Sequence, residues 1–189
     1  MGKFSEQISA DHQAFIEKQH LFFVSTAPLS SGGHINLSPK GLDCFRVLSP
    51  NLVGYMDLIS SGNETSAHTL ENGRITFMFC SFEKIPNILR LYGKGRTILR
   101  SDPEWENISQ HFMIYPSTRQ IILADISKVQ TSCGFGVPQY EYIGEREMHF
   151  EWAKQQGPDG LDQYIEEKNL KSLDGLPTPI ELGRAIKQS

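Results

Sequence analysis

Between residues 20 and 129, short runs rich in aromatic and β-branched residues alternate with clusters of turn-forming residues. Runs of this kind, bounded by glycine, proline, serine and asparagine, predict β-strands. The expected strands are residues 20–27, 34–38, 44–48, 52–58, 74–82, 88–99 and 120–129. Ser49-Pro50-Asn51 lies between two of these strands and is typical of a tight turn, so residues 44–58 are expected to form a hairpin.

Helical patterns occupy some of the intervals and both ends of the chain. The expected helices are an N-terminal one within residues 1–19, short ones over residues 62–73 and 102–112, and a helical C-terminal extension over residues 145–189. Phe4 and Phe15 lie on one side of a helix drawn through the N-terminal segment. Asn63 or Ser61 can cap the helix at residues 62–73, and Gly73 supplies its left-handed stop.

Strands of irregular length, separated by short helices rather than by regular crossovers, are atypical of a doubly wound sheet. They predict one domain over residues 1–189 that is mainly β (α+β): a small barrel with helical caps. Gly93 and Gly95 occupy alternate positions of one expected strand. Glycines placed in this way predict a bulge or the close approach of another backbone.

The charge pattern and composition exclude several classes of protein. The chain has 18 basic and 22 acidic residues, a net charge of −4, and no dense Lys/Arg run, so a nucleic-acid partner is not expected. No apolar stretch is long enough to span a bilayer and the first residues lack the apolar core of a signal peptide, so we expect a cytoplasmic protein without a membrane partner. Three cysteines without paired spacing fit reduced thiols.

Common catalytic and metal-binding motifs are absent, and no histidine pair has metal-ligand spacing. What remains is a polar run from Asp57 to Thr65 before an expected helix, with Lys40 and Arg46 nearby in the sequence. The unpaired N–H groups and the positive dipole end of a helix suit a phosphate group. The same residues also fit a polar turn that simply caps a helix, and chemistry alone leaves both readings open.

Besides the polar run, four sequence segments that occur in this order resemble those of a known family. They are GHINLSPKG (33–41), CFRVLSPN (44–51), VGYMDLISSGNETSAHTLENGRITFMFCSF (53–82) and RLYGKG (90–95). Together they resemble the pyridoxamine 5′-phosphate oxidase-like family of FMN-binding split barrels. CGFGVP (133–138) and the C-terminal SLDGLP (172–177) resemble an uncharacterised subgroup of that family.

The resemblance implies a split β-barrel that forms a homodimer, binds FMN between two barrels and oxidises or reduces a small molecule. It also implies which residues contact the flavin and its phosphate. These are Lys40, Arg46, Val47, Leu48, Tyr55, Asp57, Ser61, Gly62, Asn63, Glu64 and Thr65, with Cys133 and Gly134 approaching the ring from the partner chain or from the far side of the barrel.

The chain departs from the true oxidase at two places. Gly62-Asn63-Glu64-Thr65 stands where the oxidase has a Ser-Arg-Lys phosphate grip, and the ending ELGRAIKQS lacks the arginine that closes over the oxidase's substrate. Oxidation of pyridoxamine phosphate is therefore not expected. Alternatives to an FMN-dependent oxidoreductase are a flavin- or haem-binding protein without turnover and a deazaflavin-dependent reductase.

Overall fold

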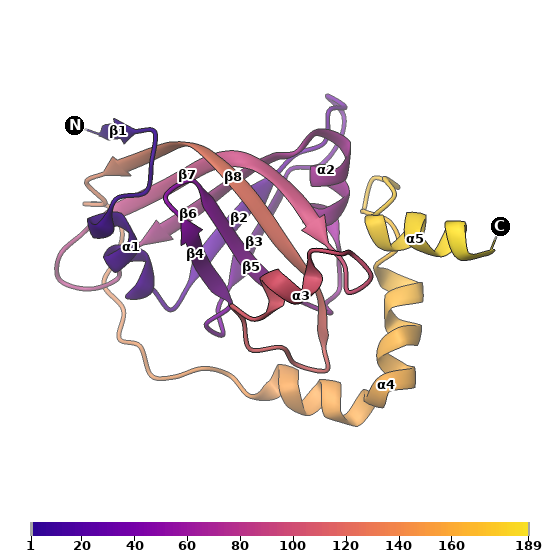
Figure 1. Ribbon diagram of the computed structural model, residues 1–189. Helices are drawn as coiled ribbons and strands as arrows, with labels where there is room; N and C mark the ends of the chain where they lie inside the picture. The colour runs from indigo at the N-terminus through magenta and orange to yellow at the C-terminus, as the bar shows by residue number, and fades with distance from the viewer. Residues whose placement is uncertain (1, 189) are drawn as a thin grey trace.

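Eight antiparallel strands and five helices make up the computed structural model, which describes residues 2–188 and the side chains of residues 2–185 (Figure 1). The strands are β1 (Lys3–Ser5), β2 (Phe22–Thr26), β3 (Asn36–Lys40), β4 (Phe45–Ser49), β5 (Leu52–Leu58), β6 (Arg74–Cys80), β7 (Ile88–Ile98) and β8 (Thr118–Ser132). The helices are α1 (Ala10–Glu17), α2 (Glu64–Asn72), α3 (Trp105–Ser109), α4 (Met148–Lys168) and α5 (Pro179–Gln188). The strand order is β3-β2-β6-β7-β8-β5-β4, with β1 added to β8.

The sheet curls until its two ends face each other across an aromatic core. Phe45 on edge strand β4 packs against Phe77 on β6, with ring centroids 5.3 Å apart. Lys40 on the other edge strand, β3, reaches Asp57 on β5. Side chains therefore close the barrel where no backbone ladder does, and the predicted split barrel is confirmed.

The hydrophobic core fills the barrel because alternate residues of its strands point inward. Val24, Tyr55, Phe77 and Leu91 are all fully buried there. Helix α2 lies against β2, β6 and β7, and a Cβ added at Gly95 would meet Thr69 of this helix at 2.9 Å. That contact is with a side chain; the predicted bulge and close backbone approach are found at Gly93, where the pairing with β8 shifts register and an added Cβ would clash with the carbonyl oxygen of Asp125.

Several boundaries differ from the sequence prediction. Phe4 belongs to β1, which pairs with the end of β8, so it does not lie on the N-terminal helix. The helix begins only at Ala10, because Ser9 caps it by accepting a hydrogen bond from the backbone of His12. Strand β3 runs through Pro39, which an edge strand tolerates since it needs no donor on its outer side.

The C-terminal residues are helical, as predicted. Helix α4 is interrupted at Gly157, whose φ of 63° lies in the left-handed region, and resumes at Pro158. A loop from Asn169 to Thr178 connects α4 to α5, which lies against α2. Among residues 2–188, no helix combines the length and the apolar character that a bilayer crossing needs.

Candidate functional site

A polar pocket of about 270 Å³ lies where β5 ends and α2 begins, facing strand β3. We call it the α2 pocket. Its lining residues are Asn36, Ser38, Lys40, Asp57, Ser60, Ser61, Gly62, Asn63, Glu64, Thr65, Arg119 and Leu173. The three residues from β3 are two apart in the sequence, so they share one face of that strand.

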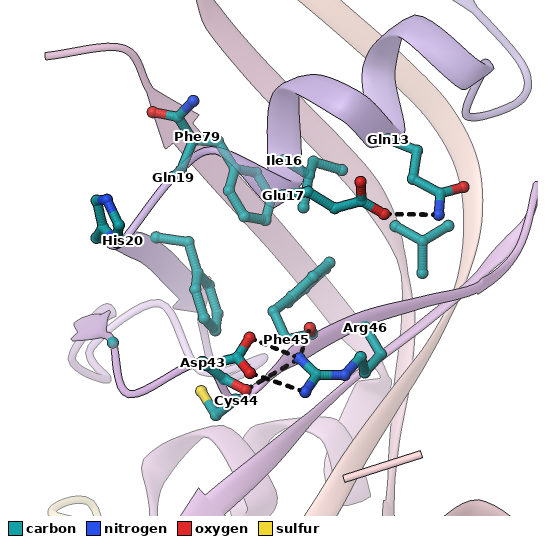
Figure 2. A pocket seen from close by; sticks show the side chains of 13 residues that line it. Gln13, Ile16, Glu17, Gln19, His20, Asp43, Cys44, Phe45, Arg46 and Phe79 are labelled. Carbon is teal, nitrogen blue, oxygen red and sulfur yellow. Dashed lines mark hydrogen bonds and ion pairs between the residues drawn. The ribbon is translucent and has the colours of Figure 1, made fainter. Parts of the chain in front are cut away.

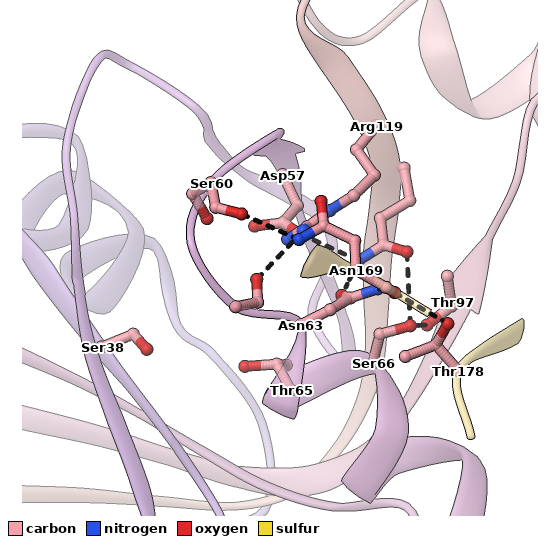
Figure 3. A network of polar contacts seen from close by, with 12 residues as sticks. Ser38, Asp57, Ser60, Asn63, Thr65, Ser66, Thr97, Arg119, Asn169 and Thr178 are labelled. Atoms are coloured by element: carbon pink, nitrogen blue, oxygen red, sulfur yellow. Dashed lines mark hydrogen bonds and ion pairs between the residues drawn. The ribbon is translucent and has the colours of Figure 1, made fainter. Parts of the chain in front are cut away.

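Asp57 is at the centre of the pocket's polar network (Figure 3). Only 2% of this residue is exposed. Its Oδ1 accepts a hydrogen bond from Lys40 Nζ at 2.8 Å, and its Oδ2 accepts from Arg119 Nη2 and, at 2.8 Å, from Gln120 Nε2. One buried carboxylate thus fixes two cations and an amide.

A β-bulge explains how two consecutive residues reach the same carboxylate. Asp57 pairs with Gln120 but Leu58 pairs with Thr118, which leaves Arg119 without a partner on β5. In a regular strand, neighbouring side chains point to opposite faces, whereas a bulge re-aims one of them. Arg119 therefore turns back into the pocket, where it also donates to the carbonyl of Gly62 at 3.0 Å.

The two cations decide the ionisation of Asp57. Burial alone would raise the pKa of this carboxyl, but the charges of Arg119 and Lys40 outweigh burial and hold the pKa well below its usual range. Asp57 is therefore an anion at neutral pH. Burial also raises the pKa of the Tyr55 hydroxyl, which lies inside the barrel, and Lys40 Nζ sits 5.5 Å from the centre of the Tyr55 ring.

Acidification is expected to destabilise the fold through Asp57. The folded-state pKa of this carboxyl lies below the unfolded value of about 3.9, so the unfolded state binds more protons as the pH falls. The stabilisation is present above about pH 4 and is lost as the pH falls toward the folded-state pKa. Denaturant unfolding between pH 7 and pH 3 should show this loss. In Asp57→Asn the free energy of unfolding should fall less steeply with decreasing pH. The same pH dependence in Asp57→Asn and in the unmodified protein would show that Asp57 does not cause the loss of stability in acid.

The first turn of α2 presents free backbone donors to the pocket. Asn63 is the N-cap residue, but its side chain does not bond to the helix. Instead it accepts from Gln120 Nε2 at 2.8 Å and donates to the carbonyl of Asn169 at 3.0 Å. The Thr65 hydroxyl also lines the pocket, so N–H and O–H groups gather at the positive end of a helix dipole.

Glu64 opposes this positive character. Its carboxylate lies at the same helix end and accepts, at 3.3 Å, from the backbone N–H of Leu173. The charged side chains that line the pocket are thus two cations, Lys40 and Arg119, and two anions, Asp57 and Glu64. The formal charges of these four side chains sum to zero, so an anionic ligand would bind at a site without a net positive charge.

The loop between α4 and α5 covers one side of the pocket. Asn169 is fully buried and donates from Nδ2 to the carbonyl of Ser60 at 2.8 Å. Asp174 accepts from the backbone N–H of His34 at 2.8 Å and contacts the His34 ring at 2.7 Å. These contacts join the C-terminal segment to the residues just before β3 and just before α2.

The structure gathers seven of the residues predicted from the sequence around the α2 pocket. They are Lys40, Asp57, Ser61, Gly62, Asn63, Glu64 and Thr65. Tyr55 is buried beneath Lys40, and its hydroxyl has no hydrogen-bond partner within the described part of the chain. Sequence reasoning missed Asn36, Ser38, Arg119 and Asn169. Alternation along β3 could have indicated the first two.

Arg46 lies in a different place. Its guanidinium pairs with Asp43 at 2.9 Å and donates to the carbonyls of Phe45 and His111. Arg46 and Val47 line a separate pocket of about 360 Å³ between α1 and β4 (Figure 2). Leu48 packs against the barrel core instead. These three residues therefore do not meet the α2 pocket within one chain.

Cys133 and Gly134 are also remote from the α2 pocket. They follow Ser132 at the end of β8, whereas Gln120 marks the pocket near the beginning of the same strand. At about 3.3 Å per residue, the intervening strand spans roughly 40 Å. Within one chain these two residues cannot share a ligand with the start of α2. Cys133 is exposed and Gly134 has a φ of 66°.

Comparison with known proteins identifies the family. The model of the pyridoxamine 5′-phosphate oxidase family matches residues 8–133. The chain belongs to this family. It is 40% identical over 196 residues to ustO, a pyridoxamine 5′-phosphate oxidase family protein of Aspergillus flavus, across 94% of this chain and 78% of ustO.

Solved structures of family-like fold support the same architecture. A single-residue variant of HupZ from Group A Streptococcus aligns with a TM-score of 0.53 and 17% identity, over 66% of this chain and 99% of HupZ. A Lactobacillus delbrueckii protein provisionally named a pyridoxamine 5′-phosphate oxidase aligns with a TM-score of 0.52 and 10% identity, over 66% of this chain and 94% of that one. At these identities the likeness concerns the fold alone.

Proposed function

We propose that this chain is an FMN-dependent oxidoreductase that acts on a small molecule as a homodimer, and that the α2 pocket holds the flavin's phosphate. The observation that carries the proposal is the donor set of this pocket. Lys40 Nζ uses one of its three hydrogen-bonding positions on Asp57, which leaves two for a ligand. The hydroxyls of Ser61 and Thr65 and the uncapped first turn of α2 add neutral donors.

The size of the pocket supports a partial site completed by a second copy. A volume of about 270 Å³ is slightly below the roughly 300–1,000 Å³ of complete ligand pockets. It suits a phosphate and part of a ribityl chain, while the flat ring system needs a further wall. The separation of Cys133 and Gly134 from this pocket along β8 means that they could contribute only from the partner chain.

Edge strand β3 offers an apolar surface for that second copy. Ile35, just before the strand, and Leu37 within it are 75% and 64% exposed, and they flank Asn36, which lines the pocket. Exposed apolar side chains on an unpaired edge strand favour association with another chain. A dimer formed here would place a second barrel beside the α2 pocket.

The protein's own residues would bind and orient rather than transfer protons. Bound FMN would supply the electron or hydride transfer. Lys40 would bind the phosphate, and Asp57 would hold Lys40 in place through its 2.8 Å hydrogen bond. Burial raises the pKa of the Cys44 thiol to about 12, so this residue is not a thiolate nucleophile at neutral pH.

The direct test is the visible spectrum of freshly purified protein together with the mass of any released ligand. Flavin absorption and the mass of FMN would support the proposal, and a deazaflavin or haem mass would replace it with one of the alternatives. Protein that is colourless and gains no flavin absorption after incubation with FMN would contradict it. Reduction of the bound flavin by NADH, NADPH or an organic donor separates an oxidoreductase from a flavin carrier.

Lys40→Met is expected to weaken FMN binding by about 10- to 100-fold. The reason is that a charge-assisted hydrogen bond to the phosphate is worth about 1.5–3 kcal/mol. Riboflavin, which lacks the phosphate, should bind Lys40→Met and the unmodified protein about equally. Fluorescence titration with both flavins measures the difference, and Lys84→Met, which removes an exposed cation elsewhere, is the matched control. Equal losses for FMN and riboflavin would refute a phosphate contact.

Glu64→Gln is expected to change FMN affinity in the opposite direction. Removing this carboxylate leaves two cations and one anion around the α2 pocket, so the phosphate should bind several-fold more tightly. Riboflavin affinity should not follow, and Glu83→Gln is the control for loss of an exposed carboxylate. Weaker FMN binding in Glu64→Gln would mean that Glu64 contacts the ligand directly rather than repelling it.

A further inference from the structure

A larger cavity, of about 550 Å³, lies between helix α4 and the end of the barrel where β8 begins. We call it the α4 cavity; Figure 1 shows α4 beside that end of the molecule. Its volume is within the range of complete ligand pockets. The cavity plays no part in the proposed flavin site, although Arg119 lines both.

One wall of the α4 cavity is apolar. Ile59 follows β5, and Ala153, Leu161 and Ile165 come from the inner face of α4. Ile59, Ala153 and Leu161 form a small buried cluster of their own, separate from the core of the barrel. A hydrocarbon or aromatic group is therefore the part of a ligand that would lie against this wall.

The rim of the α4 cavity is charged rather than apolar. Arg100 and Lys154 both line the cavity, and neither forms an ion pair with a described side chain. Arg100 is held in place by the carbonyl of Thr118 at 3.2 Å and by the Trp105 ring, 5.2 Å from the guanidinium carbon. Asp162 is the acidic residue of the lining. Two unpaired cations thus face one anion.

Helix α4 is interrupted at the edge of the α4 cavity. The helix stops at Gly157 and restarts at Pro158, so the first N–H groups of the second half lack helical acceptors. Gly157, Pro158 and Leu161 all line the cavity. The kink therefore shapes this side of the α4 cavity, whereas the first residues of the new segment that carry N–H groups, Asp159 and Gly160, are outside its lining.

Arg119 also lines the α4 cavity, but its polar atoms are directed elsewhere. Only 2% of its side chain is exposed, and its Nη1 and Nη2 are used by Gly62 and Asp57. Its Nε is buried and has no hydrogen-bond acceptor in the part of the chain that the structure describes. Buried donors without acceptors are rare because they lose the hydrogen bonds that water provides. This Nε has almost no accessible surface, so a ligand in the α4 cavity could contact Arg119 but could not reach this donor.

From these features we infer that the α4 cavity binds a small organic carboxylate with an apolar body. The carboxylate would lie between Arg100 and Lys154, and the apolar body would contact Ala153 and Leu161. A group with one negative charge matches the excess of one cation in the lining, whereas a neutral molecule would gain no ion pair with Arg100 or Lys154. This inference does not depend on flavin binding at the α2 pocket.

Calorimetric titration of the 189-residue chain with phenylacetate and with phenylacetamide tests the inference. The two probes share an aromatic body and differ in charge. Phenylacetate should bind, and phenylacetamide should bind at least about tenfold more weakly. Binding of both probes with equal affinity, or of neither at millimolar concentration, would overturn the inference.

Variants locate the binding site. Lys154→Gln should weaken phenylacetate about three- to tenfold and leave phenylacetamide unchanged, whereas Lys128→Gln, which removes an exposed cation from β8, should alter neither. Ala153→Phe should abolish binding by filling the apolar wall, with circular dichroism confirming that the variant folds. If it does not fold, Lys154→Gln decides. Unchanged phenylacetate affinity in Lys154→Gln would place the ligand elsewhere and refute the site.

Discussion

Asp57→Asn is expected to lower the free energy of unfolding by about 3–5 kcal/mol. The substitution removes the buried anion that Lys40 and Arg119 share, and breaking one side of a buried ion pair leaves the opposite charges uncompensated. Arg119 cannot move to water without distorting the bulge on β8, since its side chain is 2% exposed. Urea unfolding followed by circular dichroism measures the loss.

A matched variant and a double variant test whether the lost ion pairs cause the loss of stability in Asp57→Asn. Asp125→Asn removes an exposed carboxylate from the same strand as Arg119 and should change stability by less than about 0.5 kcal/mol. Adding Lys40→Met to Asp57→Asn should recover part of the loss, because one orphaned cation disappears. Equal stability of Asp57→Asn and the unmodified protein would show that the carboxylate carries little of the network.

The same substitution separates stability from binding. Asp57→Asn leaves Lys40 and Arg119 against a single anion, Glu64, so the α2 pocket becomes more cationic. The amide oxygen of the asparagine can still accept from Lys40 Nζ and hold it in place, so if the pocket holds a phosphate, FMN affinity per folded molecule should rise while the free energy of unfolding falls. A ligand that binds elsewhere would show no rise.

The barrel could be predicted from the sequence because its determinants are local. Each strand carries its own aromatic and β-branched run, and Gly73 ends α2 with a φ of 73°, as the Asn72-Gly73 pair predicts. The first strand was hidden because three exposed residues carry no burial pattern, and Phe4 then suggested a helix. Its pairing with β8 depends on residues more than a hundred positions away.

The site was only half predictable for a similar reason. Lys40, Asp57 and Thr65 are close in the sequence, and two nearby sequence segments, residues 33–41 and 53–82, contain them. Arg119 reaches Asp57 only because a bulge reverses the direction of its side chain, and alternation along the strand gives no sign of that. Asn169 reaches Ser60 from the C-terminal segment, and no local pattern predicts such a contact.

Phe77→Ala is expected to lower the free energy of unfolding by about 3–5 kcal/mol. Phe77 is fully buried at the centre of the barrel, where its ring lies 5.3 Å from the ring of Phe45 and 6.1 Å from that of Tyr55. Removing it leaves a cavity among neighbours that can collapse only in part, because strands on both sides hold them in register. Phe135→Ala, at a side chain that is 82% exposed, should be nearly neutral.

The core variant should also affect the α2 pocket, because Tyr55 connects the two. The Tyr55 ring packs on Phe77 from one side and lies 5.5 Å from Lys40 Nζ on the other. Without Phe77 the Tyr55 ring gains room to move, and Lys40 loses part of the surface that positions it. Folded Phe77→Ala should therefore show a smaller preference for FMN over riboflavin, whereas Phe77→Leu should keep most of it. A preserved preference in Phe77→Ala would mean that Asp57 alone positions Lys40.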